Sequence, residues 1–189
     1  MPEQIFETIV TTRDEHGLPH IVPLGIRHIE GFVVLAPFRP SKTLDNVLRE
    51  RHAVVNYTDE VRVFAGCLTG RHDWPTVESP AGPRLASGLA HDELELVRIE
   101  EDELRPRLFM RLVRSGTHGS FQGFNRAQAA VVEACILVSR LHLLTEEKIR
   151  SELAYLSIAI EKTAGIKERE AWNWLIKKIE DHYQASPKV

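Results

Sequence analysis

The strongest constraint on the fold is a succession of short apolar segments, separated by turn signals, near the start of the chain. Residues 5–12 are rich in β-branched side chains, and residues 13–17, which include acidic residues and a glycine, are typical of a hairpin turn. A second strand is expected over residues 20–26. The Glu30-Gly31 pair then predicts a tight turn into the apolar run 32–36, which is typical of a strand buried on both faces. Three strands joined by short turns predict an antiparallel meander.

The second strand contains Pro23 and Gly25, which are both poor residues for the centre of a sheet. Proline cannot donate to the hydrogen-bond ladder, and glycine has no side chain to pack. The pair therefore predicts an edge or a bulge where a ligand meets bare backbone. A β-bulge at a barrel corner without any ligand explains the same residues equally well.

A short amphipathic helix is predicted over residues 42–50, because Leu44, Val47 and Leu48 share one face at spacings of three and four. A fourth strand is expected to follow it over residues 53–57, which are again mostly apolar. The helix therefore starts directly after the third strand of the meander and leads into the fourth.

The start of this helix combines several groups that bind phosphate. A helix that begins near Ser41 presents free backbone N–H groups and the positive end of its dipole. Ser41 and Thr43 add hydroxyl donors, and Lys42 and Arg39 add positive charge, so that a phosphate monoester has several partners. The alternative is an ordinary N-cap, since Ser41 is a standard capping residue and Asp45 is a favourable first-turn acid.

The middle of the chain is less regular. Residues 61–69 form an apolar run too short to distinguish strand from helix, with a slight preference for helix, and residues 70–88 are expected to be a loop with several turn signals. Residues 89–99 and 107–115 partly alternate, and they predict an antiparallel hairpin with one solvated face. The strand total then reaches six or more, which is enough to close a small barrel.

From Gly123 onward the pattern becomes helical. Asn125 is a good N-cap for a helix over about residues 126–143, whose apolar residues nearly encircle it and predict burial. A second helix is expected over residues 146–163, where Gly165 stops it, and a third over residues 167–183. The last part of the chain is therefore predicted to be a helical subdomain.

Composition limits the classes of partner. The chain has 189 residues and a formal net charge of −3, with basic residues scattered among acidic ones, which argues against nucleic acid as the main partner. No run of about 18 apolar residues exists, so no membrane span is expected. The N-terminal segment does not resemble a signal peptide, and Cys67 and Cys135 are expected to be buried thiols, so a cytoplasmic protein is predicted.

Motifs for autonomous catalysis are missing. The sequence has no nucleophile elbow, no GxGxxG and no Walker loop. The nine histidines do not occur in zinc-binding spacing, and a site from His16, His20 and His28 would need the hairpin to bring them together, so no metal is predicted. An enzyme without its own acid, base or nucleophile would have to borrow its chemistry from a cofactor.

Four motifs in order carry a family resemblance: IVPLGI, PFRPSKTLDNV, VVNYTD and GFNRAQAAVVEACILVSRL. Together they resemble the domain-of-unknown-function 447 family, and the order of strands and helix is similar to the FMN-binding split barrel of flavin reductases and pyridoxamine-phosphate oxidases. The resemblance implies an α+β fold, mainly an antiparallel split β-barrel with a C-terminal helical subdomain. It implies a barrel over residues 1–122 and a helical subdomain over residues 123–189 packed on it.

The resemblance also implies a homodimer that holds FMN between its subunits. The Ser-Lys-Thr helix start matches the split-barrel phosphate grip, the Pro-Leu-Gly strand matches the backbone that faces the flavin ring, and Arg126 is a candidate to stabilise the reduced ring. The full set of implied cofactor-binding residues is Val22, Pro23, Leu24, Gly25, Arg39, Ser41, Lys42, Thr43, Asn46, Asn56, Thr58, Asp59, Asn125 and Arg126. For Asn125 and Arg126 the alternative is a helix cap with a surface salt bridge.

Two positions depart from the pattern expected of relatives. Leu24 stands where methionine is expected and Phe38 where tyrosine is expected, so a sulfur or hydroxyl contact is lost there, while the fold is expected to survive.

The expected function is that of an FMN-binding flavoprotein that acts as an oxidoreductase on a small molecule or a nicotinamide. Two alternatives stay open. One is a non-catalytic module that binds or carries a flavin, a deazaflavin or another phosphorylated compound. The other is a helical interaction protein whose barrel serves as a dimerisation scaffold.

Overall fold

The computed structural model describes residues 3–185, and within them the chain forms eight strands and five helices. In chain order they are β1 (Phe6–Arg13), β2 (Pro19–Ile29), β3 (Phe32–Leu35), α1 (Lys42–Glu50), β4 (His52–Tyr57), α2 (Val61–Leu68), β5 (Thr76–Ser79), β6 (Gly82–Leu85), β7 (Ala90–Glu100), β8 (Arg107–Thr117), α3 (Arg126–Ser139), α4 (Glu146–Thr163) and α5 (Ile166–Ala185).

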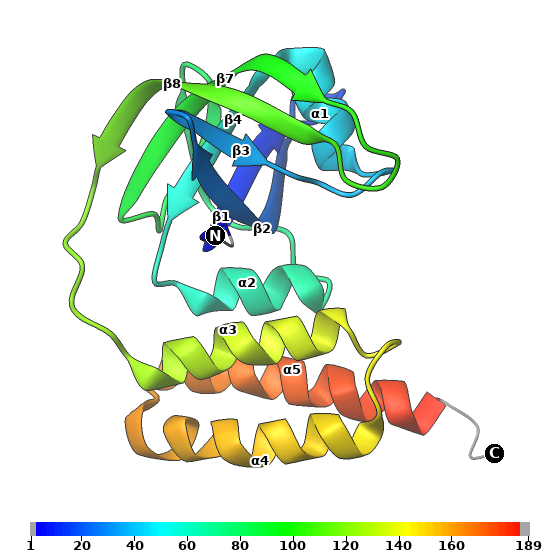
Figure 1. Ribbon diagram of the computed structural model, residues 1–189. Helices are drawn as coiled ribbons and strands as arrows, with labels where there is room; N and C mark the ends of the chain where they lie inside the picture. The colour runs from blue at the N-terminus through cyan, green and yellow to red at the C-terminus, as the bar shows by residue number, and fades with distance from the viewer. Residues whose placement is uncertain (1–2, 186–189) are drawn as a thin grey trace. The chain divides into compact units, whose positions relative to one another are not determined.

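Six of the strands close into an antiparallel barrel in the order β1-β2-β3-β8-β7-β4 (Figure 1). The first three strands pair in sequence, as the meander predicts, and β7 pairs with β8 as the expected hairpin. The barrel closes where β1 pairs with β4, with Ile9 opposite Asn56. The predicted fold class, an α+β chain with a small antiparallel barrel and C-terminal helices, is confirmed.

The turn between β2 and β3 fixes the register of the meander. Glu30 and Gly31 both have positive φ angles, of 51° and 81°, which suits the two central residues of a type I′ hairpin turn. Ile29 therefore lies opposite Phe32, and the pairing continues to Ile26 opposite Leu35. The tight turn expected from the Glu-Gly pair is confirmed.

The segment 70–88 is more ordered than the sequence suggested. Within it, β5 and β6 form a two-stranded hairpin, with Thr76 opposite Leu85, so the prediction of an unstructured loop was wrong there. Strands of four residues that contain proline carry too little periodicity to be recognised. The hairpin is held by the barrel instead, since the Thr11 hydroxyl donates to the Pro83 carbonyl and the Leu85 N–H donates to Asn56 Oδ1.

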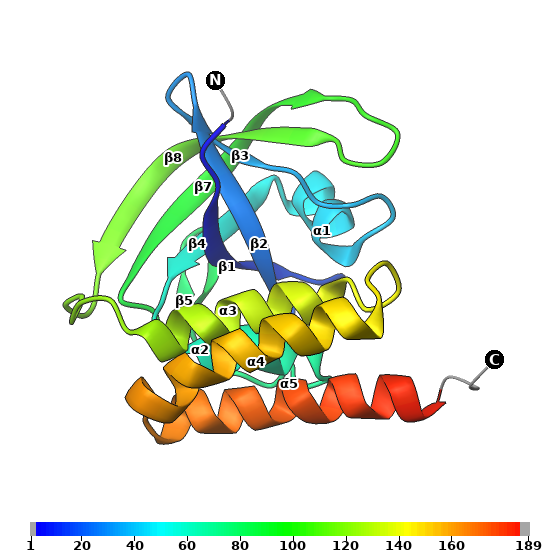
Figure 2. The ribbon, with the colours of Figure 1, turned by 60° about the horizontal axis from the view of Figure 1, so that its bottom comes forward.

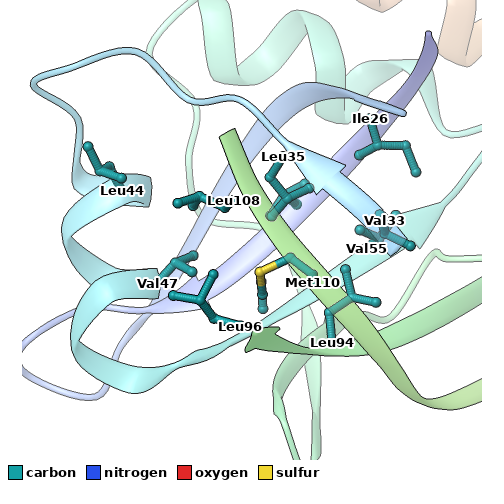
Figure 3. Close-up of a cluster of buried hydrophobic side chains, with 12 residues drawn as sticks. Ile26, Val33, Leu35, Leu44, Val47, Val55, Leu94, Leu96, Leu108 and Met110 are labelled. Atoms are coloured by element: carbon teal, nitrogen blue, oxygen red, sulfur yellow. The ribbon is translucent and has the colours of Figure 1, made fainter. Parts of the chain in front are cut away.

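The barrel encloses an apolar core to which α1 contributes. Leu94, Leu96, Leu108 and Met110 from the β7–β8 hairpin pack with residues of β1 to β4. The apolar face of α1 joins this cluster, and Figure 3 shows the α1 side chains directed toward the strands of the hairpin. The helix that carries the predicted phosphate grip is thus anchored by its buried face.

The contacts within the chain define two compact units. One comprises residues 3–58 and His72–Phe121, which form the barrel, α1 and the β5–β6 hairpin; the other comprises Asp59–Arg71 with residues 122–185. The segment that the sequence left undecided is helix α2, and it groups with the C-terminal helices rather than with the strands.

In the helical unit, α3 packs against α2, α4 and α5, and Figure 2 shows α4 lying along α3. The α3 helix ends at Ser139, before the predicted position 143, whereas α4 covers the predicted residues 146–163. The two cysteines are free thiols, and Cys135 is buried. Within the described residues, no helix has both the length and the apolar character that a membrane crossing requires.

A buried carboxylate links two helices of this unit. Glu60 precedes α2, and it is paired with Arg62 at 2.8 Å and with Lys167 of α5 at 2.9 Å. Burial alone would raise the pKa of Glu60, but the hydrogen bonds and charges of Arg62 and Lys167 outweigh it and hold the pKa below its ordinary value. A carboxyl with a depressed pKa in the folded state stabilises the fold above its unfolded pKa, and this contribution is lost as the pH falls through the folded value.

We therefore predict that Glu60→Gln lowers the free energy of unfolding at neutral pH and flattens its decline between about pH 6 and pH 3. Urea unfolding of the whole chain at a series of pH values measures this, and the exposed Glu161→Gln serves as the control. Parallel pH profiles for Glu60→Gln and the wild type would contradict the assignment.

Candidate functional site

The N-terminus of α1 is capped by a side chain and still has unused backbone donors. Ser41 is the N-cap, its Oγ accepts from the Leu44 N–H at 3.3 Å, and its carbonyl accepts from the Asp45 N–H at 3.1 Å. Ser41 therefore caps α1, as its residue type predicts. Among the described residues, no acceptor engages the N–H groups of Lys42 and Thr43, so the cap leaves these two donors available to an anion.

Charge and burial divide the first turn of α1 into two sides. Lys42 is exposed and forms no ion pair with any residue in the described part of the chain, whereas Thr43 and Asn46 are buried. The Asn46 amide donates to Thr12 Oγ1 at 2.9 Å and accepts from Arg49 at 3.2 Å, so this side chain is committed to β1 and to its own helix. The structure brings Ser41, Lys42 and Thr43 together at the corner and turns Asn46 inward.

Arg39 has a partner of its own. Its guanidinium pairs with Glu101 in the β7–β8 loop at 3.0 Å, and its backbone N–H donates to the Leu104 carbonyl at 2.8 Å. The pairing with Glu101 neutralises much of the charge that the sequence offered to a phosphate. Lys42 is therefore the stronger candidate for the cation of the corner.

The predicted ring-facing strand segment has one unpaired backbone edge. β3 pairs with β2 only at Ile26–Ile29, so within the described chain the residues 19–25 have β1 on one side and no strand on the other. The register with β1 is continuous from Arg13 opposite Pro19 to Phe6 opposite Ile26, so the expected edge is found and the alternative bulge is not.

Along this edge, side chains and backbone point to different places. Val22 and Leu24 are half-buried and pack against the barrel core. Along an antiparallel strand, the backbone N–H and C=O groups of successive residues point alternately to its two sides. Ile29 pairs with Phe32 across the β2–β3 turn, so its backbone groups point toward β3. Pro23 and Gly25 lie an even number of residues from Ile29, so their backbone groups point to the same side, where no strand pairs with them. Pro23 has no N–H to lose there, which explains why proline is tolerated inside this strand.

At the end of β4, the side chains of Asn56 and Thr58 form hydrogen bonds within the chain. Asn56 is completely buried, and its amide donates to the Ile9 carbonyl at 3.1 Å and accepts from the Leu85 N–H at 2.7 Å. Asn56 therefore joins β4, β1 and the β5–β6 hairpin, and we do not retain it as a ligand contact. The Thr58 hydroxyl donates to the Ser87 carbonyl at 3.0 Å. Asp59, whose carbonyl accepts from the Val61 N–H at 2.9 Å, starts the helical unit.

Asn125 and Arg126 also belong to the helical unit. Asn125 Oδ1 accepts from the Ala127 N–H at 2.8 Å, and its amide donates to the Thr163 carbonyl at 3.2 Å, so the cap of that alternative is found. Within the described residues Arg126 forms no ion pair, so the salt bridge is not found. Arg126 is exposed at the start of α3 and lines a hollow of about 240 Å³ together with Glu133 and Tyr155.

One residue near the phosphate corner was not in the predicted set. His20 of β2 is half-buried, and its Nε2 lies 3.2 Å from the Thr43 hydroxyl. Burial lowers the pKa of His20, the nearby positive charges of Lys42 and His72 lower it further, and Asp14 opposes them. A single histidine in a strand belongs to no motif, so only the fold reveals that it stands beside α1. In the described residues, no group of three or more His, Cys, Asp or Glu side chains is arranged to hold a metal ion.

The family assignment rests on both parts of the chain. The matching family is described as protein of unknown function (DUF447). Residues 6–119 match its N-terminal domain, and residues 125–177 match its second domain. The chain therefore belongs to this family, as its four motifs predicted. No curated protein sequence matches it.

Solved structures place the fold among flavin-associated proteins. The FMN-bound protein MM1853 from Methanosarcina mazei, of the same family, superposes with a TM-score of 0.79 at 22% identity, over 94% of this chain and 96% of that one. The FMN-binding protein from Thermus thermophilus has a TM-score of 0.54 at 14% identity, over 62% and 74%. The styrene monooxygenase flavin reductase from Pseudomonas putida S12 has a TM-score of 0.51 at 13% identity, over 60% of this chain and 81% of that one. The predicted split-barrel fold is thereby confirmed.

We predict that Asn56→Ala destabilises the barrel by about 2 kcal/mol, because the buried Leu85 N–H loses the acceptor that Asn56 Oδ1 provides. The free energy of unfolding from urea titration measures the effect. Asn173→Ala, which removes an exposed asparagine from α5, is the control. A loss below about 1 kcal/mol would show that the junction of β4 with β1 and the β5–β6 hairpin does not depend on this amide.

Proposed function

We propose that the chain binds FMN, with the phosphate at the N-terminus of α1 and the flavin ring along the unpaired edge of β2. The observation that carries this proposal is the coincidence of two findings. A relative of the same family that overlaps nearly the whole chain is an FMN-bound protein. At the start of α1 in this chain, Lys42 has no ion pair within residues 3–185, and it lies beside helix N–H groups without an acceptor there.

The donor set at the corner fits a phosphate monoester. The N–H groups of Lys42 and Thr43 lie at the positive end of the helix dipole, and the Lys42 ammonium is exposed and free to move toward an anion. The Ser41 hydroxyl accepts from the backbone, so its own proton remains available to donate. A doubly charged phosphate would thus meet one full positive charge and several neutral donors.

The β2 edge fits a flat heteroaromatic ring. The backbone of Pro23 and Gly25 lies along it, and glycine leaves the backbone without a side chain on that residue. On the face of the strand, the Ile5 side chain occupies the space beside Gly25, since a Cβ there would come within 2.7 Å of it, so the open part of Gly25 is its backbone at the strand edge. Backbone donors and acceptors along a strand edge can pair with the polar rim of the ring, while half-buried apolar side chains exclude water from its face.

We further propose that the protein is a flavin-dependent oxidoreductase. FMN, when bound, supplies a ring that exchanges a hydride with a nicotinamide or another small molecule. The residues of the chain would orient the ring and hold the phosphate. Bleaching of bound FMN by NADH or NADPH under anaerobic conditions supports an oxidoreductase, and a flavin that neither nucleotide reduces favours the carrier alternative.

A homodimer with FMN at its interface is part of the proposal. The outer half of β8 leaves Leu112 and Val113 exposed at 48% and 57%, which are adjacent apolar side chains on a barrel strand. Exposed apolar side chains of this kind are suited to burial against a second copy.

We predict that Lys42→Ala weakens FMN binding roughly 10- to 100-fold, because a charge-assisted hydrogen bond contributes about 1.5–3 kcal/mol. Quenching of flavin fluorescence measures the affinity. Riboflavin, which lacks the phosphate, should bind the variant and the wild type equally, and Lys177→Ala on α5 is the matched lysine control. Equal FMN affinity in Lys42→Ala and the wild type would place the phosphate elsewhere.

For the assembly, we predict that sedimentation equilibrium gives twice the monomer mass of 21.5 kDa, and that Leu112→Lys shifts the protein toward the monomer. The physical reason is that a charge replaces an apolar contact across the interface. A wild-type chain that sediments as a monomer at micromolar concentration, with FMN added, would refute the dimer.

A further inference from the structure

We propose that His20 is a further ligand of the FMN phosphate, and that it takes up one proton when the phosphate binds. This inference rests on the proposed function, since it concerns the same corner, but it adds a residue and a pH dependence that FMN binding by itself does not require.

His20 lies beside the proposed phosphate-binding residues but belongs to a different element. It comes from β2, while Ser41, Lys42 and Thr43 come from the start of α1. Its Nε2 lies 3.2 Å from the Thr43 hydroxyl, and Thr43 has one of the two free N–H groups. A small rotation of the imidazole would exchange the threonine hydroxyl for a phosphate oxygen held at that N–H group. Strand and helix would then contact the phosphate from two sides.

The charges around His20 explain why it should be neutral before the phosphate arrives. Lys42 of α1 and His72 of the segment after α2 face it with positive or potentially positive charge, and Asp14 of the β1–β2 turn is the acid that opposes them. Together with burial, the cations hold the pKa of His20 below its ordinary value. A dianion between His20 and Lys42 would reverse this balance by stabilising the imidazolium.

The proton balance gives the sign of the effect. The neutral imidazole gains one proton from the solvent on its free ring nitrogen, no bond to the phosphate is made or broken, and the complex gains a charge-assisted hydrogen bond. A group whose pKa rises on binding favours binding at low pH, so the benefit from His20 should shrink as the pH rises above its pKa in the complex. The phosphate of FMN titrates near pH 6 itself, so the variant and the wild type must be compared at each pH.

The experiment measures FMN affinity of the wild type and of His20→Gln from about pH 6.5 to pH 9. Glutamine keeps a donor but cannot be protonated. We expect His20→Gln to weaken FMN binding about tenfold at the low end of the range and much less at the high end. His28→Gln, which changes an exposed histidine of the same strand, should track the wild type at every pH. Riboflavin should bind His20→Gln and the wild type with equal affinity.

Calorimetry of the wild type alone provides a second measurement that does not depend on the folding of any variant. Titration of FMN at about pH 7.5, in buffers of different ionisation enthalpy, should show proton uptake, and titration of riboflavin should show none. A constant affinity ratio across the pH range, or equal proton uptake for FMN and riboflavin, overturns the inference while FMN binding stands. Failure of the wild type to bind FMN overturns the proposed function and this inference together.

Discussion

The position of α1 depends on two apolar side chains that enter the barrel core. Leu44 and Val47 are 3% and 0% exposed, and they pack with the strands of the barrel (Figure 3). Because these two residues fix the rotation of a nine-residue helix, Lys42 is turned to solvent and Thr43 toward β2. The corner that we assign to the phosphate is thus a consequence of core packing.

The sequence cannot separate two kinds of polar residue in this part of the chain. Asn46 and Asn56 are buried and hydrogen-bonded, and they join α1 to β1 and β4 to β1. Lys42 is exposed and unpaired within the described residues. In the sequence all three are polar residues near a phosphate-like motif. Their different roles arise from the direction in which the fold turns each side chain, which depends on contacts across more than thirty positions, as the Asn46–Thr12 hydrogen bond illustrates.

Local signals explain what the sequence predicted well. The bounds of α1 followed from the Ser41 cap and the spacing of Leu44 and Val47, and the β2–β3 turn followed from Glu30-Gly31, because each depends on neighbouring residues only. The family and the split barrel followed from the order of motifs. The β5–β6 hairpin was missed because its short strands are held by tertiary hydrogen bonds.

The candidate site was predictable only in part, for the same reason. The Ser-Lys-Thr corner is contiguous in the sequence and could be recognised there. His20 lies 23 positions away from Thr43 and joins the corner only because β2 and α1 are packed together. Asn125 showed both a capping pattern and a family motif, and the structure assigns its amide to the cap.

The most direct test of the central claim is a crystal structure of the chain grown with FMN. The account predicts the phosphate within hydrogen-bonding distance of the Lys42 and Thr43 N–H groups and of the Lys42 ammonium, with the ring along the edge of β2 that contains Pro23 and Gly25. An FMN phosphate bound away from the start of α1, with no contact to the Lys42 and Thr43 N–H groups, would contradict it.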